Sequence, residues 1–149
     1  QEIEAHQLFP DRTIHYLAFG LRSRELAARG IDLTRRIMSP ENIVTVALQA
    51  AIYMGFSPIC LLGSDHTWIL HLNESRHFYK ESRHALSRAG YSEWFGEDFS
   101  SYCMSYVETW EQFRVLRRLA ADRGIEIVNM TDGGGLDVFP RVPFGSYPQ

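Results

Sequence analysis

Two short segments contain residue types that can recognise a sugar or a nucleotide. The first consists of Gly63, Ser64, Asp65 and His66 and, two residues later, Trp68. The carboxylate of Asp65 can accept hydrogen bonds from a ribose or sugar hydroxyl, or bind a divalent cation. His66 can act as a general base, because the unperturbed pKa of an imidazole is about 6.5. A second interpretation stays open, in which Asp65 caps the following turn and His66 is a polar residue with satisfied hydrogen bonds.

The second segment is a glycine-rich turn made of Thr131, Asp132, Gly133, Gly134 and Gly135. Successive glycines can form a nest of backbone amides around phosphate oxygens. They can equally form a flexible turn after a strand, where the backbone needs positive φ angles. The turn lacks the Gly-Lys-Ser/Thr ending of a Walker A loop and does not match G-x-G-x-x-G, so neither nucleotide-binding signature is present.

Each segment follows a predicted strand. Residues 58–63 form a continuous apolar run, which is typical of a strand covered on both faces of a parallel sheet, and residues 125–130 are a second strand of this kind. In open α/β sheets, ligands bind beyond the carboxyl ends of the strands. We therefore expect the two turns to face one shared crevice.

A helix is predicted before each of these strands. The first spans 42–54, with Ser39 as its N-cap, Pro40 suited to the helix start and Gly55 as its terminator. The second spans 106–123 and carries an apolar stripe at three- and four-residue steps, which predicts a face packed into the core.

The amino-terminal part shows the same alternation of predicted strands and helices. Residues 13–18 are β-prone and are followed by Gly20, and residues 22–29 form a helical candidate closed by Gly30. The fold class predicted is α/β, with a Rossmann-like, mostly parallel sheet flanked by helices. The chain reads as one domain over 1–149, with an insertion or lid rich in aromatic residues and histidine at about 64–104.

The composition excludes several classes of protein. The net charge is −3 and the pI is near 6.1, which gives no electrostatic footprint for nucleic acid. Cys60 and Cys103 lie far apart, so we expect no disulfide, a buried Cys60 and a reducing, cytoplasmic compartment. The longest apolar stretch, 43–56, contains 14 residues, whereas a bilayer span needs about 18 or more.

A second group of polar residues lies within the predicted lid. His77, Glu81 and His84 have helical spacing on one face, so a metal site is conceivable there. The basic residues around them favour a solvated helix face, and no metal ligand is assigned. A Ser-His-Asp hydrolase lacks support, because no G-x-S-x-G elbow is present.

The motifs resemble those of a known bacterial family. The segments 59–68, 77–79, 129–132 and 136–139, together with Ala-Leu-Gln at 47–49, resemble the MptE-like Rossmann proteins, which carry a domain of unknown function and often lie in surface-polysaccharide gene clusters. The resemblance covers most of residues 13–142. Its most specific part is the strand followed by Gly-x-Asp-His-x-Trp.

That family is similar to bacterial sialyltransferases that use a CMP-sugar, and to an archaeal pterin pyrophosphokinase that transfers diphosphate from ATP with Mg²⁺. The resemblance implies a Rossmann-like glycosyltransferase for lipopolysaccharide or capsule, with a CMP-linked nucleotide sugar as donor, a glycan acceptor, no nucleic-acid partner and possible peripheral contact with the inner membrane. Asp65, His66 and His77 are the expected catalytic residues. The expected substrate- and nucleotide-binding residues are Gly63, Ser64, Trp68, Tyr79, Thr131, Asp132, Gly133, Gly134 and Gly135.

Two alternatives accompany this expectation. A diphosphotransferase would bind ATP with Mg²⁺ through Asp65, Asp132 or Asp137. A Rossmann-like binding module would carry out no chemistry.

The chain departs from the family pattern at two places. The sialyltransferases have a catalytic histidine just before the helix that matches 106–123, whereas residues 102–106 here read Tyr-Cys-Met-Ser-Tyr. The family's Gly-Asn-Gly-Pro-Ser phosphate-binding motif would lie upstream of Gln1. We therefore expect the carboxyl-terminal part of a larger domain, which would leave a sheet edge uncovered and favour a homo-oligomer.

Overall fold

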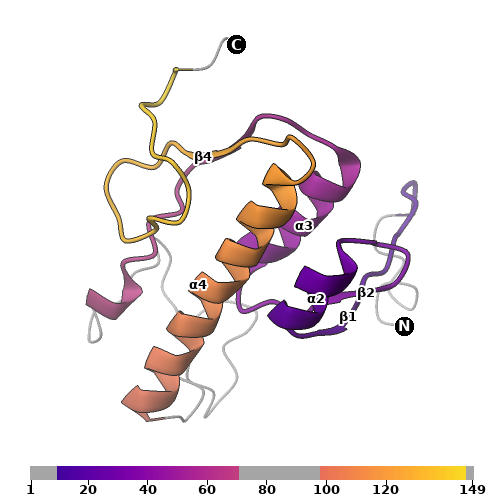
Figure 1. Ribbon diagram of the computed structural model, residues 1–149, viewed down its shortest axis with the longest axis horizontal. Helices are drawn as coiled ribbons and strands as arrows, with labels where there is room; N and C mark the ends of the chain where they lie inside the picture. The colour runs from indigo at the N-terminus through magenta and orange to yellow at the C-terminus, as the bar shows by residue number, and fades with distance from the viewer. Residues whose placement is uncertain (1–9, 71–97, 147–149) are drawn as a thin grey trace.

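The computed structural model describes residues 10–70 and 98–146 (Figure 1). Its elements in chain order are β1 (Ala18–Leu21), α2 (Ser23–Arg29), β2 (Arg36–Met38), α3 (Ile43–Met54), β3 (Ile59–Leu61), the 3₁₀ turn η1 (Trp68–Leu70), α4 (Phe99–Ala121) and β4 (Ile127–Asn129). The α/β class is therefore confirmed.

The described strands form two separate parallel pairs. β1 pairs with β2, and β3 pairs with β4 in the register Ile59 to Ile127 and Leu61 to Asn129. The long helix α4 packs against both α2 and α3, as Figure 1 shows. The parallel pairing agrees with the sequence prediction, but the described strands do not join into one sheet.

The core lies between α4 and the shorter elements. Its fully buried side chains come from several elements and from the turn after β4, because amphipathic elements pack their apolar faces together. They include Leu26, Ile37, Met38, Leu48, Ile52, Phe113, Leu116 and Leu136. The predicted core face of 106–123 is confirmed at Phe113 and Leu116.

Helix α3 begins later than its predicted cap. The side chain of Asn42, rather than Ser39, accepts a hydrogen bond from the backbone N–H of Thr45 at 3.1 Å. The carbonyl of Ser39 instead accepts a bond from the side chain of Gln112 on α4, at 2.9 Å. Gly55 ends the helix in the left-handed region with φ 77°, as predicted.

Helix α4 is longer than its periodicity predicts. It starts at Phe99, where the side chain of Asp98 accepts a bond from the N–H of Ser101 at 2.9 Å. Several apolar side chains of its first turns, such as Met104, are exposed, so no clear buried stripe marks that part in the sequence. The carboxyl end is Ala121, two residues before the predicted end, and Asp122 is the C-cap.

The first strand also differs from its prediction. β1 covers Ala18–Leu21 and includes Gly20, whereas the β-prone segment 13–18 is almost entirely outside it. Pairing with Arg36–Met38 decides which residues form the strand, and β-propensity is a weak guide to that choice. Helix α2 and its closing Gly30 agree with the prediction.

The predicted burial of β3 on both faces is wrong. Leu61 is buried, but Ile59 is only half-buried and Cys60 is exposed, so Cys60 is not the small core residue expected. Successive side chains of a strand point to opposite faces, so Cys60 points away from the face on which Leu61 is buried. In the segments 10–70 and 98–146, no helix combines the length and apolarity that crossing a bilayer requires.

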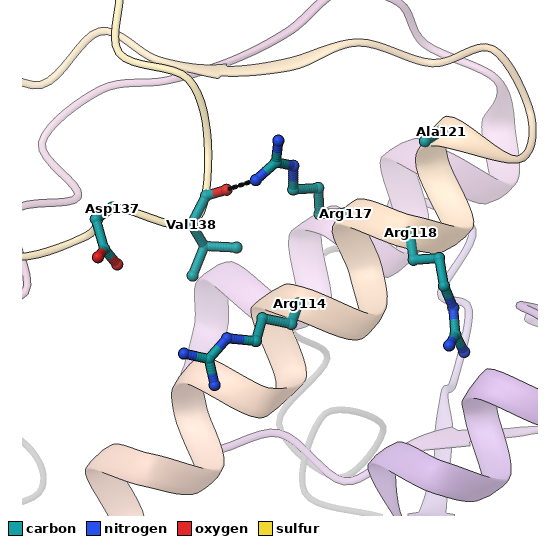
Figure 2. Close-up of a pocket in the computed structure, with 6 residues that line it drawn as sticks. All are labelled: Arg114, Arg117, Arg118, Ala121, Asp137 and Val138. Carbon is teal, nitrogen blue, oxygen red and sulfur yellow. Dashed lines mark hydrogen bonds between the residues drawn. The ribbon is translucent and has the colours of Figure 1, made fainter.

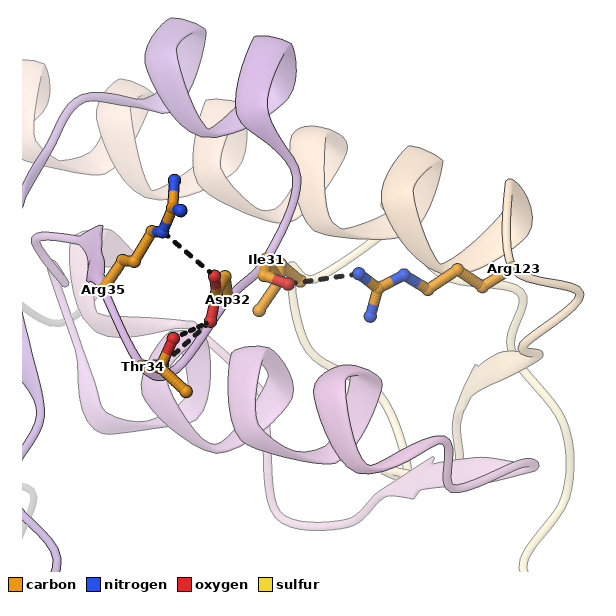
Figure 3. Close-up of polar contacts among 5 residues, drawn as sticks. All are labelled: Ile31, Asp32, Thr34, Arg35 and Arg123. Carbon is orange, nitrogen blue, oxygen red and sulfur yellow. Dashed lines mark hydrogen bonds and ion pairs between the residues drawn. The ribbon is translucent and has the colours of Figure 1, made fainter.

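An arginine after α4 joins three parts of the fold (Figure 3). Arg123 donates to the carbonyl of Ile31 at 3.1 Å, the bond drawn in Figure 3, and to that of Ile52 at 3.2 Å. The carbonyl of Ile52, at the end of α3, also accepts a bond from the N–H of Gly55 at 3.2 Å, so Arg123 gives it a second donor. Asp32, beside Ile31, accepts bonds from both the N–H and the hydroxyl of Thr34.

Candidate functional site

The turns after β3 and β4 lie against each other. The N–H of Met130 donates to the carbonyl of Leu61 at 2.8 Å and so extends the strand pairing. Beyond it, the N–H of Ser64 donates to the hydroxyl of Thr131 at 2.9 Å. The predicted convergence of the two turns is confirmed, and it follows from parallel strands ending at the same edge of a sheet.

Close packing between backbones explains the glycine-rich turn. The N–H of Gly135 donates to the carbonyl of Asp65 at 2.6 Å. Gly133 and Gly134 have φ angles of 71° and 87°, a region that residues with a Cβ rarely adopt. The glycines thus have a structural role in the turn, and the phosphate-binding nest remains a prediction.

Arg141 holds this turn closed and was missed by the sequence analysis. Its guanidinium donates to the carbonyls of Thr131 at 2.8 Å, of Gly134 at 3.0 Å and of Leu136 at 3.2 Å, and also to the carbonyl of Gly133. The turn therefore directs several carbonyl oxygens toward one cation. Nothing local marks Arg141, because an arginine in a proline-containing tail is usually a surface residue.

His66 lies within an aromatic box, defined here as the rings of Trp68, Trp110 and Phe113. The ring-centroid distances from His66 are 5.9 Å to Trp68, 5.7 Å to Trp110 and 5.2 Å to Phe113. Only 7% of the surface of His66 is exposed. Its φ of 50° is in the left-handed region, which is uncommon for a residue other than glycine.

The environment of His66 favours the neutral imidazole. Burial lowers its pKa below the usual 6.5, and the nearby carboxylate of Asp65 opposes that effect more weakly. No hydrogen bond among the described residues involves the imidazole, and none of the buried side-chain nitrogens there lacks a partner.

Helix α4 supplies the other wall of the site. Tyr106 stacks on Trp110 with ring centroids 5.0 Å apart, and its hydroxyl donates to the backbone carbonyl of His66. The indole N–H of Trp110 donates to the carboxylate of Asp137 at 2.9 Å. Trp110 thus joins the turn after β3 to the turn after β4.

The remaining predicted residues differ in their surroundings. Asp65 is exposed, and one of its carboxylate oxygens accepts a bond from Thr67 at 3.4 Å. Asp132 is also exposed, whereas Ser64 is buried and Trp68 is 46% exposed. The proposed roles of these side chains remain predictions.

Part of the predicted site lies outside the described residues. This applies to His77, Tyr79, Glu81 and His84. Within the described segments, no three histidine, cysteine, aspartate or glutamate side chains come together as a group that could hold a metal ion.

The chain is a mixed α/β protein whose candidate site lies at the carboxyl ends of a parallel strand pair. Comparisons with protein-family models, with curated proteins and with solved structures gave no match.

Proposed function

We propose that this protein is a glycosyltransferase that uses a CMP-linked nucleotide sugar to build a bacterial surface polysaccharide at the cytoplasmic side of the inner membrane. The observation that carries the proposal is the contact between two turns. The turn bearing Asp65 and His66 meets the turn bearing Thr131 and Asp137 at the carboxyl ends of β3 and β4. Nucleotide ligands of α/β proteins bind at such edges, and the resemblance in sequence supplies the class of donor.

His66 is the general base of this proposal. A neutral imidazole can take the proton of the acceptor hydroxyl, and burial keeps His66 neutral near pH 7. The acceptor oxygen then bonds to the anomeric carbon of the donor. The bond from that carbon to the phosphate oxygen breaks, and CMP leaves with the electron pair.

The neighbouring side chains would bind the substrates. Asp65 is exposed and can accept a hydrogen bond from a sugar hydroxyl. Trp68 is nearly half exposed and offers a flat apolar surface to a sugar or base ring. His77 and Tyr79 remain candidates from the sequence.

Release of CMP from a CMP-sugar by the full chain, with and without a glycan acceptor, tests the proposal. His66→Asn removes the base while suiting the positive φ at this position. We expect the rate to fall by about 10²–10⁴-fold. His15→Asn is the matched control at an exposed histidine and should retain the rate. An unchanged rate in folded His66→Asn would overturn the role of His66.

Binding of nucleotides separates the sugar transferase from a diphosphotransferase. Thermal shifts are measured with CMP, CDP, UDP and ATP, each with and without Mg²⁺. Stabilisation by CMP without Mg²⁺ supports the sugar transferase. If ATP is the one nucleotide that stabilises the protein, and does so only in the presence of Mg²⁺, the diphosphotransferase would be favoured. No shift with any nucleotide would favour a non-catalytic module.

A further inference from the structure

A second concave site opens on α4, beside the turn that follows β4 (Figure 2). Its volume is about 450 Å³, which is within the range of small-molecule sites. The lining residues are Arg114, Arg117, Arg118, Ala121, Asp137 and Val138. Three of these six side chains are guanidinium groups, so the site has a strong excess of hydrogen-bond donors.

Arg117 and Arg118 each lie about one helical turn from Arg114 on α4. Residues three and four positions apart are neighbours on a helix surface, and this spacing relates Arg114 to Arg117 and to Arg118. Figure 2 shows Arg114 and Arg117 reaching toward the segment of Asp137 and Val138, whereas Arg118 extends along another flank. All three arginines are exposed, so their charge is available to a ligand from solvent.

The arginines differ in their existing partners. Arg117 donates to the carbonyl of Val138 at 2.6 Å and thereby fixes the wall of the site. Arg114 pairs with Glu111 at 2.6 Å, but the two side chains are 58% and 51% exposed, and such surface pairs are weak. Among the described residues, the side chain of Arg118 makes no hydrogen bond or ion pair, and only its backbone carbonyl accepts a bond, from Asp122. A stronger anion can therefore recruit Arg114 and Arg118 at little cost.

The opposite wall carries a single carboxylate. Asp137 accepts the indole N–H of Trp110 with one oxygen at 2.9 Å, which fixes the side chain. Its other oxygen can accept a hydrogen bond from a hydroxyl group. An anion alone would gain nothing from this carboxylate, whereas a ligand with both a phosphate and hydroxyls would match both walls.

We infer that this site binds a phosphorylated sugar or similar polyhydroxy phosphate. The phosphate lies between Arg114 and Arg117, where bidentate guanidinium contacts are available, and Arg118 adds to the positive field. A hydroxyl of the ligand donates to Asp137. The inference does not depend on glycosyl transfer, because apart from Asp137 it uses no residue of the His66 crevice.

Titration of the full chain with glucose 1-phosphate at low ionic strength tests the inference. Isothermal calorimetry gives the affinity, and the indole N–H resonance of Trp110 reports on the site through its bond to Asp137. We expect saturable binding that weakens with salt, and glucose without the phosphate should not bind.

The double variant Arg114→Gln/Arg118→Gln keeps the bond between Arg117 and Val138, so the wall of the site remains. We expect its affinity to fall by at least about tenfold. Arg35→Gln removes an arginine that is 82% exposed and lies outside the lining, and it should bind as the unaltered chain does.

Equal affinity of the double variant and the unaltered chain would overturn the inference, as would the absence of binding at low salt. Sedimentation with phosphatidylglycerol vesicles, without binding of the soluble compound, would also overturn it, because the arginines would then serve a lipid surface. None of these outcomes predicts how His66→Asn affects glycosyl transfer. The binding site on α4 and the proposed transferase activity can therefore be refuted independently of each other.

Discussion

Gly134 lies directly against the backbone of Asp65. A Cβ atom placed on Gly134 would come within 2.5 Å of the Asp65 carbonyl oxygen and 2.6 Å of its Cα. This contact packs the turn after β4 against the turn after β3. The position of Asp65 therefore depends on the lack of a side chain at Gly134, sixty-nine residues further along the chain.

Gly134→Ala should therefore separate the two turns. We expect a loss of about 1–3 kcal/mol in the free energy of unfolding from the backbone strain, and a further loss from the clash with Asp65. Gly133→Ala is the matched control, because its φ of 71° is similar and no atom lies within 4 Å of its added Cβ. Urea unfolding compares the two variants, and equal losses would show that the close approach does not matter.

Arg141→Lys should loosen the glycine-rich turn. Lysine keeps the charge but cannot donate to four carbonyls at once from a planar fork. We expect a loss of about 1–3 kcal/mol in the free energy of unfolding, since hydrogen bonds to a charged group are lost. Faster hydrogen exchange at the Gly135 amide would accompany it. Unchanged hydrogen exchange and stability in Arg141→Lys would show that the turn does not depend on the guanidinium of Arg141.

His66 should make stability depend on pH. Its pKa in the folded protein is below the usual 6.5, so between these two values the unfolded chain binds more protons. The contribution of His66 to the free energy of unfolding should therefore be complete above about pH 6.5. It should be lost as the pH decreases toward the folded-state pKa. Urea titrations at several pH values should show a shallower decline in His66→Asn. Parallel profiles for the two proteins would contradict this.

Arg123→Gln should weaken the packing of α3 against the loop after α2. The guanidinium donates to a carbonyl in each place, of which Figure 3 shows that of Ile31. We expect the free energy of unfolding to fall by about 1–2 kcal/mol. Arg35→Gln breaks an exposed pair with Asp32 and should change stability by no more than about 0.5 kcal/mol. Thermal melts of both variants check this. An equal loss of stability in the two variants would show that Arg123 contributes no more than an exposed surface charge.

The chain should self-associate. Phe56 and Leu62, on either side of β3, are 57% and 64% exposed, and β3 pairs with only one described strand. Light scattering should show species larger than a monomer, reduced in Phe56→Ser/Leu62→Ser. Phe144→Ser is the control, at a residue that is 73% exposed near the end of the described chain. A clean monomer would contradict the prediction.

The sequence by itself determined the elements whose signals are local. The glycines after α2 and α3, the apolar run of β3 and the amphipathic part of α4 mark their positions because caps and periodicity act within a few residues. The rule that parallel strands end at one edge also predicted the meeting of the two turns.

The tertiary structure decided what surrounds those elements. His66 is enclosed by rings of α4, and Tyr106, which donates to its carbonyl, lies 40 residues away. The four carbonyls around Arg141, the exposure of Cys60 and the division into two strand pairs likewise depend on which segments pack together. Such contacts join groups from different elements, so no propensity or spacing along the chain carries their signal.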